Sequence, residues 1–259
     1  MLRVACCVLL DECTTHHATR NTRRILPVMQ RCIEPEWLDE LPPDDPRAVW
    51  SREDLLRANA WMGHAGMMAR ALRSTCRGPG ARRLVELGTG DGRFMQRVAR
   101  RLRPGWQDTS VLMLDRQNVM SPATCQGYAA LGWRVTPVKA DALDWLRQAP
   151  APACDAMIVN LALHHFTEAQ LADLLREAAR VTRTFIALEP RRARRCLFFT
   201  HLIWIIGCNE VTRKDAPISV RAGFKGQELS QLWPTGQGWS LQERRAGFFS
   251  HSFIAQRRE

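Results

Sequence analysis

Between residues 83 and 190, short apolar runs alternate with amphipathic helical patterns, and this alternation constrains the fold more than any other feature. The apolar runs have the length of buried strands and cover residues 84–88, 111–115, 134–141, 154–160 and 184–190. Helical patterns lie between them at 94–102, 122–131, 142–148 and 168–181. Strands joined by helices pair in parallel through right-handed crossovers. The pattern therefore predicts an α/β fold with a mainly parallel sheet and helices on both faces.

The flanking segments depart from this alternation. Residues 31–80 predict a helical cap, with a short helix in 34–46 and a longer one from an N-cap at Ser51 to about Arg73. Beyond the fifth strand, an insertion is predicted to contain an apolar helix, a polar loop and another helix, at 196–207, 208–220 and 226–233. Two closing strands are predicted at 239–247 and 248–256. We expect one domain over 81–259, with 193–233 as its helical insertion.

The first 30 residues show neither pattern. Residues 1–10 hold one arginine and a short apolar run, but no small-residue cleavage site follows, which disfavours a signal peptide. We expect residues 1–30 to be disordered or to extend beyond the natural start, for which Met29 is a candidate.

The chain carries a formal net charge of +11, which is often a nucleic-acid signal. Of its 37 basic residues only Lys139, Lys214 and Lys225 are lysines, and the arginines are dispersed along the chain. We therefore expect a solvated basic surface and no nucleic-acid partner.

The nine cysteines are odd in number and form no C-x-x-C pair. This disfavours a disulfide framework or a zinc site, both of which need regular spacing, and favours reduced thiols in the cytoplasm. The apolar run 196–207 is too short to span a bilayer, which takes about 20 residues. It is open to three interpretations: a buried helix, a lid over an apolar substrate, or an interfacial helix flanked by arginines at a membrane surface.

A glycine-rich loop follows the first strand and opens a helix. Glu86, Gly88, Gly90 and Gly92 are spaced E-x-G-x-G-x-G, with Asp91 inside the loop. Glycines there permit a tight turn and close backbone approach to a ligand. Dinucleotide-binding loops use G-x-G-x-x-G instead, so that a helix N-terminus meets a pyrophosphate. The acids favour a cationic ligand, which makes NAD(P) the weaker alternative.

Three further polar residues end the next strands. Asp115 ends the second strand, Asp141 the third and Asn160 the fourth. Open parallel sheets bind ligands at the carboxyl ends of their strands, so these side chains are expected to share one site with the glycine loop.

Over residues 83–190 these motifs, in this order, resemble class I S-adenosylmethionine (SAM)-dependent methyltransferases. The resemblance implies a Rossmann-like seven-stranded sheet that ends in an antiparallel hairpin. It also implies that Asp115 accepts hydrogen bonds from the ribose hydroxyls and that Asp141 meets the adenine amino group. The full set of expected cofactor-binding residues is Glu86, Gly88, Thr89, Gly90, Gly92, Asp115, Arg116, Asp141, Ala142 and Asn160.

The run from Asn160 to Phe166 resembles the segment that follows the fourth strand in small-molecule methyltransferases such as those of quinone biosynthesis. His164 and His165 are the catalytic candidates, because a histidine beside the transferred methyl can act as general base. Either could instead orient substrate or cap the next helix, and His165 is slightly preferred. On the cap, Trp61 and Met62 are more typical of core than of cofactor contacts, and His64 is a weaker base candidate.

The resemblance implies methyl transfer from SAM to a small aromatic or quinone-like acceptor, by O- or C-methylation, with S-adenosylhomocysteine (SAH) as product. A lipid tail on the acceptor, and peripheral membrane contact through 196–207, are options. No metal is expected. The alternatives are an RNA or protein methyltransferase that uses the basic surface, and a non-catalytic SAM-binding scaffold. The sequence leaves the oligomeric state open, with a homodimer as one option.

Overall fold

A computed structural model of the chain describes residues 29–76, 82–117, 119–201, 203, 207–236 and 238–258. The expectation for residues 1–30 therefore falls almost entirely outside the described residues. The core is a seven-stranded sheet with strand order β3-β2-β1-β4-β5-β7-β6. Its strands are β1 (Arg83–Leu87), β2 (Thr109–Asp115), β3 (Trp133–Lys139), β4 (Cys154–Asn160), β5 (Thr182–Pro190), β6 (Trp239–Ala246) and β7 (Ser250–Arg257).

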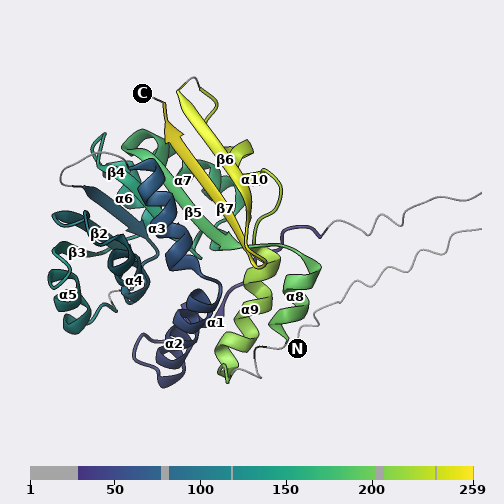
Figure 1. Ribbon diagram of the computed structural model, residues 1–259. Helices are drawn as coiled ribbons and strands as arrows, with labels where there is room; N and C mark the ends of the chain where they lie inside the picture. The colour runs from purple at the N-terminus through teal and green to yellow at the C-terminus, as the bar shows by residue number, and fades with distance from the viewer. Residues whose placement is uncertain are drawn as a thin grey trace, which may run out of the picture.

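The first five strands pair in parallel, whereas β7 runs antiparallel between β5 and β6 (Figure 1). The central strand β4 is buried along nearly its whole length, because helices cover both faces of the sheet at this point. Strand β3 lies at the edge and is mostly exposed. The predicted α/β fold, a mainly parallel seven-stranded sheet closed by an antiparallel hairpin, is confirmed.

Helices cover the sheet in two layers, each with its own apolar core. Residues of α3, α4 and α5, among them Met68, Met95 and Tyr128, pack on one face. Residues of α6, α7 and α10, among them Leu146 and Leu174, pack on the other. These helices are α3 (His64–Thr75), α4 (Arg93–Leu102), α5 (Pro122–Ala129), α6 (Ala142–Gln148), α7 (Glu168–Val181) and α10 (Glu228–Leu232).

The N-terminal cap differs from its prediction at two points. It consists of α1 (Trp37–Glu40), α2 (Pro46–Trp61) and α3. Helix α2 starts five residues before Ser51, with Asp45 as N-cap and a proline at its first position, where a missing N–H costs nothing. Ser51 lies inside the helix and is buried, with its hydroxyl 2.9 Å from that of Thr212. The single predicted helix is broken at Gly63, whose φ of 73° is left-handed.

The insertion also differs from its prediction. The segment expected as a polar loop is mostly helix α9 (Glu210–Ala222), which begins at the N-cap Asn209. Helix α9 is amphipathic in spite of its charged residues, since Val211, Ile218 and Val220 are buried on one face. The predicted apolar helix corresponds in part to α8 (Arg194–Thr200), and residues 202 and 204–206 lie outside the described residues. None of the helices in the described part of the chain is long and apolar enough to cross a membrane.

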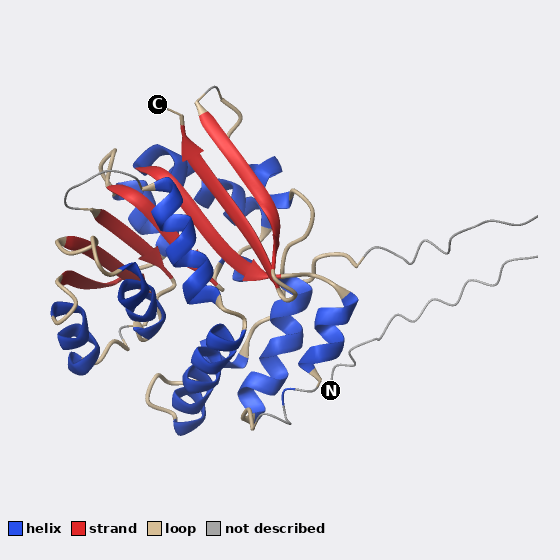
Figure 2. Ribbon diagram, viewed as in Figure 1, coloured by secondary structure: helices blue, strands red, loops and turns tan. Residues whose placement is uncertain are grey.

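Helix α2 of the cap and helices α8 and α9 of the insertion form one layer, although they lie far apart in the sequence. Asp54 of α2 accepts hydrogen bonds from the backbone N–H of Asn209 (2.7 Å) and the hydroxyl of Thr212 (3.0 Å). Figure 2 shows α2, α8 and α9 grouped beyond one end of the sheet. This end is where the parallel strands finish, so the layer covers the edge at which the sequence places the site.

Candidate functional site

The loop between β1 and α4 lies against the neighbouring strands. The N–H of Gly88 donates to the carbonyl oxygen of Leu114 at 2.9 Å. A Cβ at Gly88 would come within 2.7 Å of the Cβ of Ala162, and the φ of 71° favours glycine there. Gly90 is also left-handed, and a Cβ on it would meet no atom within 4 Å. The loop is therefore tight on its β4 side and open above Gly90.

Asp115 lies at the carboxyl end of β2, beside this loop. One carboxylate oxygen accepts a hydrogen bond from the N–H of Gly90, and the other accepts from Gln117, both at 2.8 Å. Burial raises the pKa of Asp115, and the charge of Asp39 adds to the rise, although the two backbone hydrogen bonds oppose it. Each oxygen keeps lone-pair capacity, so the side chain can still accept hydrogen bonds from a diol.

Glu86, on β1, is the most deeply buried acid of this region. It is 2 % exposed, and its Oε2 has no hydrogen-bond partner. Burial raises its pKa well above the ordinary value, and the charges of Asp115 and Asp91 raise it further. Three acids thus converge on one loop, and among the described residues only Asp91 forms an ion pair, with Arg93 of α4 at 2.6 Å. A cationic ligand would relieve the repulsion among them.

Asn160, at the end of β4, holds the cap in place. Its carbonyl oxygen accepts from Nδ1 of His64 at 2.8 Å, and its amide donates to Asn59 at 3.1 Å. The other ring nitrogen of His64 accepts from the Ser250 hydroxyl at 2.5 Å. Burial lowers the pKa of His64 to about 4, so the ring is neutral at physiological pH. The Asn160 side chain is thus engaged within the protein, and its cofactor role stays a prediction.

Three of the expected cofactor-binding residues, Asp141, Ala142 and Arg116, differ in their environment. Asp141 is the N-cap of α6, where one carboxylate oxygen accepts from the N–H of Leu143 at 2.9 Å. Ala142 is the partly buried first residue of that helix. The Arg116 side chain is exposed, with its guanidinium 3.9 Å from Asp39. Helix capping accounts for Asp141 as fully as cofactor binding would, so its role also stays a prediction.

His164 is buried between two carboxylates. Its Nδ1 lies 2.8 Å from Oε2 of Glu189, and its Nε2 lies 3.3 Å from Oε1 of Glu36. Burial by itself would lower the pKa of His164, but hydrogen bonds and charge from Glu189 and Glu36 raise it to about 9. The ring is therefore an imidazolium at neutral pH, with each N–H donated to a carboxylate. Glu189 also accepts from the N–H groups of Ala162 and Leu163.

His165 is adjacent in sequence but in the opposite state. Its side chain is 28 % exposed, and its Nδ1 lies 3.3 Å from Asp39. Burial lowers the pKa of His165, and the positive charge of His164, whose ring centroid is 4.2 Å away, lowers it further. Within the described residues, no hydrogen bond engages Nε2 of His165. A neutral, partly accessible imidazole can accept a proton, whereas His164 already holds one.

The same region contains the one group of side chains that could hold a metal ion among the described residues. Glu36, His164 and His165 each bring a ligand atom within 4.8 Å of the others. Metal binding would require His164 to be deprotonated. The two carboxylates beside it favour the protonated ring instead. The absence of a metal requirement remains a prediction.

Sequence reasoning missed several residues of this site. Glu189 lies near the carboxyl end of β5, and the strand-end rule that selected Asp115 would have selected it too. Glu36 and Asp39 gave no such signal, because they sit in an acidic, proline-rich segment far away in sequence. Arg31 gave none either, yet its guanidinium donates to the carbonyl oxygens of Leu163, His164 and Phe166.

The chain resembles known proteins in its family pattern and in its fold. A family model described as a methyltransferase domain matches residues 84–184. No curated protein matches the sequence. Among solved structures, the pyocyanin biosynthetic protein PhzM is 17% identical with a TM-score of 0.53, over 85% of this chain and 60% of that chain.

Two further structures resemble the chain to a similar degree. An O-methyltransferase family protein from Burkholderia thailandensis is 18% identical with a TM-score of 0.51, over 83% of this chain and 61% of that chain. The plantazolicin methyltransferase BpumL, solved in complex with SAH, is 10% identical with a TM-score of 0.53, over 83% of this chain and 92% of that chain. The chain thus spans about three fifths of PhzM and of the Burkholderia protein. At these identities the likeness shows the fold.

Proposed function

We propose that the protein transfers a methyl group from SAM to a small acceptor, leaving SAH, since residues 84–184 match a family model described as a methyltransferase domain. The observation that carries this proposal is the convergence of Glu86, Asp91 and Asp115 on a left-handed glycine loop at the carboxyl edge of the sheet. An acid cluster suits a ligand that carries a sulfonium and an ammonium group. BpumL, which shares the fold, was solved with SAH.

The residues at the ends of β1, β2 and β4, beneath the cap, would hold the cofactor. Asp115 accepts hydrogen bonds from the ribose hydroxyls, because its oxygens are fixed by Gly90 and Gln117 and keep free lone pairs. Glu86 faces the cationic end of the ligand. Thr89 and Gly92 complete the loop, while Arg116, Asp141 and Ala142 would line the adenine side of the cofactor. When bound, the cofactor supplies an electrophilic methyl group, and attack by the acceptor breaks its bond to sulfur.

The acceptor loses one proton as the new bond forms, and His165 receives it. In the part of the chain that the structure describes, Nε2 of His165 has no hydrogen-bond partner, and burial and the charged His164 keep the ring neutral. His164 does not exchange a proton at neutral pH, because Glu36 and Glu189 hold both of its N–H groups. It acts as a positioning residue whose fixed ring supports that of His165. This assigns different roles to two residues of the same type.

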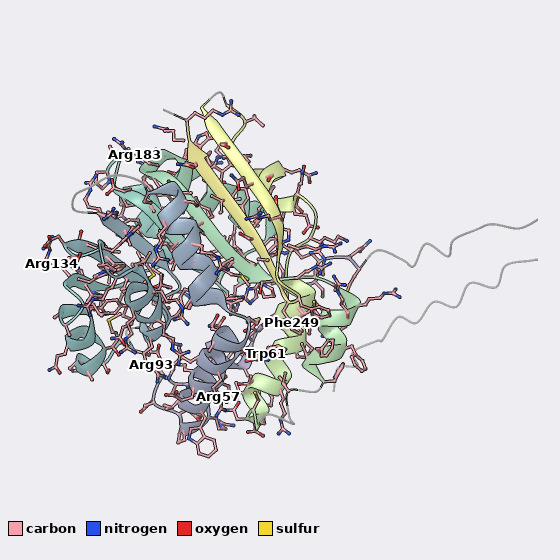
Figure 3. The ribbon with its side chains drawn as sticks, in the orientation of Figure 1. Arg57, Trp61, Arg93, Arg134, Arg183 and Phe249 are labelled. Atoms are coloured by element: carbon pink, nitrogen blue, oxygen red, sulfur yellow. The ribbon has the colours of Figure 1, made fainter. Side chains whose placement is uncertain are left out.

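The acceptor is an apolar aromatic molecule, as a cluster of rings beside the cap supports. Trp61 and Phe249 lie 4.7 Å apart between ring centroids, and Figure 3 shows them next to each other. Phe199 packs edge-on against Phe248 and Phe249, at 5.4 and 5.5 Å. Phe198, at 61 % exposed, extends this cluster at the surface of α8. Such a surface suits a quinone-like or lipid-tailed acceptor and peripheral membrane contact through 196–207.

The test begins with calorimetric titration of the native protein with SAH, beside Asp115→Ala. We expect micromolar binding (order of magnitude) in the native protein and a loss of about 100-fold in the variant, because two charge-assisted hydrogen bonds disappear. Labelled SAM is then offered with a panel of phenols and quinols, and transfer of label to an acceptor is measured. A well-folded native protein that binds no SAH would contradict the proposal.

A further inference from the structure

Arg52 lies on the face of α2 that looks toward the end of the sheet. On the same face, seven residues further along, the side chain of Asn59 accepts a hydrogen bond from that of Asn160 in β4. Two helical turns, about 10 Å, separate the two positions. Arg52 lines a cavity of about 400 Å³ with Pro43, Asp44, Val49, Asp91, Arg93, Val119, Ser121 and Thr124. The cavity that Arg52 lines thus includes Asp91 of the glycine loop and Arg93 at the start of α4.

The guanidinium of Arg52 is only partly satisfied. Its Nη1 donates to the carbonyl oxygen of Pro43 at 2.8 Å, whereas its Nη2 is buried without a hydrogen-bond partner. In the described part of the chain, no carboxylate forms an ion pair with it. An arginine stays charged in proteins, so a buried N–H of this group without an acceptor is costly.

The acids near Arg52 are already engaged by other groups. The side chain of Asp91 accepts from Nε of Arg93 at 2.7 Å and from its backbone N–H at 3.0 Å. Glu53 also pairs with Arg93, at 2.5 Å. The oxygens of Asp115 accept from backbone N–H groups. Burial lowers the pKa of Arg52 more strongly than Asp91 and Asp115 raise it, which agrees with a cation that lacks its own counter-ion.

We propose that Arg52 and this cavity form a subsite for a carboxylate of a bound ligand. The subsite rests on the proposed function, and the carboxylate has two sources there: the amino-acid end of the cofactor, or an acidic group on the acceptor. The arrangement then places opposite charges on opposite partners. Glu86 faces the cationic part of the ligand, and the unpaired N–H of Arg52 receives the anionic part. Asp44, which also lines the cavity, is exposed and, within the described residues, forms no ion pair with Arg52.

The experiment compares SAH with 5′-methylthioadenosine, which keeps the nucleoside and the sulfur but lacks the amino-acid end. Both are titrated into the native protein, Arg52→Met, Arg52→Lys and the control Arg47→Met, an exposed arginine of the same helix. Thermal unfolding verifies that each variant folds. If the cofactor supplies the carboxylate, Arg52→Met should weaken SAH about 10- to 100-fold and leave 5′-methylthioadenosine unchanged. Arg52→Lys should recover part of the loss, and Arg47→Met should change neither.

A second arm tests the acceptor as the source. Benzoate is titrated into each protein saturated with SAH, and binding that is present in the native protein and lost in Arg52→Met would assign the subsite to an acidic acceptor. The proposal is overturned if folded Arg52→Met matches the native protein with SAH, 5′-methylthioadenosine and benzoate alike. Failure of the proposed function looks different, because the native protein would then bind neither nucleoside.

Discussion

The two halves of the site handle buried acids in opposite ways. On the β1–β2 side, no cationic side chain of the described residues pairs with Glu86 or Asp115, and burial raises the pKa of both. On the β4–β5 side, Glu36 and Glu189 enclose the imidazolium of His164. The first half has acid oxygens to offer to a ligand, whereas the second is complete without one. The first arrangement can bind a cationic ligand, whereas the second stabilises the fold through internal ion pairs.

The largest effect is expected at His165, whose imidazole is neutral beside the charged ring of His164. His165→Gln should lower kcat by about 100- to 10 000-fold, the usual contribution of a general base, while SAH affinity stays within about twofold. The measurement is kcat and the SAH dissociation constant, once a labelled acceptor is known. His164→Gln serves as the comparison and should lose stability as well as turnover. Unchanged kcat in His165→Gln would remove the base from this half of the site.

The next largest effect is expected on the stability of the β4–β5 half, called here the paired half, in which Glu36 and Glu189 pair with His164. Glu189→Gln should lower the free energy of unfolding by about 3–5 kcal/mol, because it leaves a buried imidazolium beside an amide. Urea unfolding at pH 7 measures the loss. Glu243→Gln is the matched control, since Glu243 forms a buried pair with His251 at 2.7 Å between β6 and β7. Both variants should lose stability, but only Glu189→Gln should also lower kcat.

The ion pair between Glu189 and His164 also predicts how stability depends on pH. The pKa of His164 is about 9 in the folded protein against an ordinary value of 6.5, so its raised value stabilises the fold below pH 6.5. That contribution is lost as pH rises through about 9, and a shift of this size corresponds to about 3 kcal/mol. Urea unfolding between pH 6 and pH 10 should show the decline in the native protein and a flatter profile in Glu189→Gln. Equal slopes would show that His164 is not charged.

The two halves also differ in how far the sequence predicts them. The β1–β2 half, which contains Glu86 and Asp115 and is called here the receptive half, follows from local patterns. These are strands of the right length, a glycine loop and acids on the strands near their carboxyl ends. The paired half joins residues far apart in the chain, such as Glu36 with His164, and no local pattern marks such a contact. The prediction of a loop over 208–220 was wrong for a related reason. Its charges suggest solvent, but contacts with the cap bury one face of α9.

The smallest effect concerns the receptive half, where the raised pKa of Glu86 should make ligand binding release a proton. Glu86 is neutral in the folded protein above pH 4.5, up to its raised pKa, and the ammonium group of SAH favours the ionised form. SAH affinity should therefore increase with pH by up to about tenfold per unit over that window. Calorimetry in phosphate and in Tris, whose ionisation enthalpies differ, counts the protons released. Glu86→Gln should bind SAH more weakly and release none. If native protein and variant release the same number, Glu86 is already ionised, and the contrast between the halves would rest on Asp115 alone.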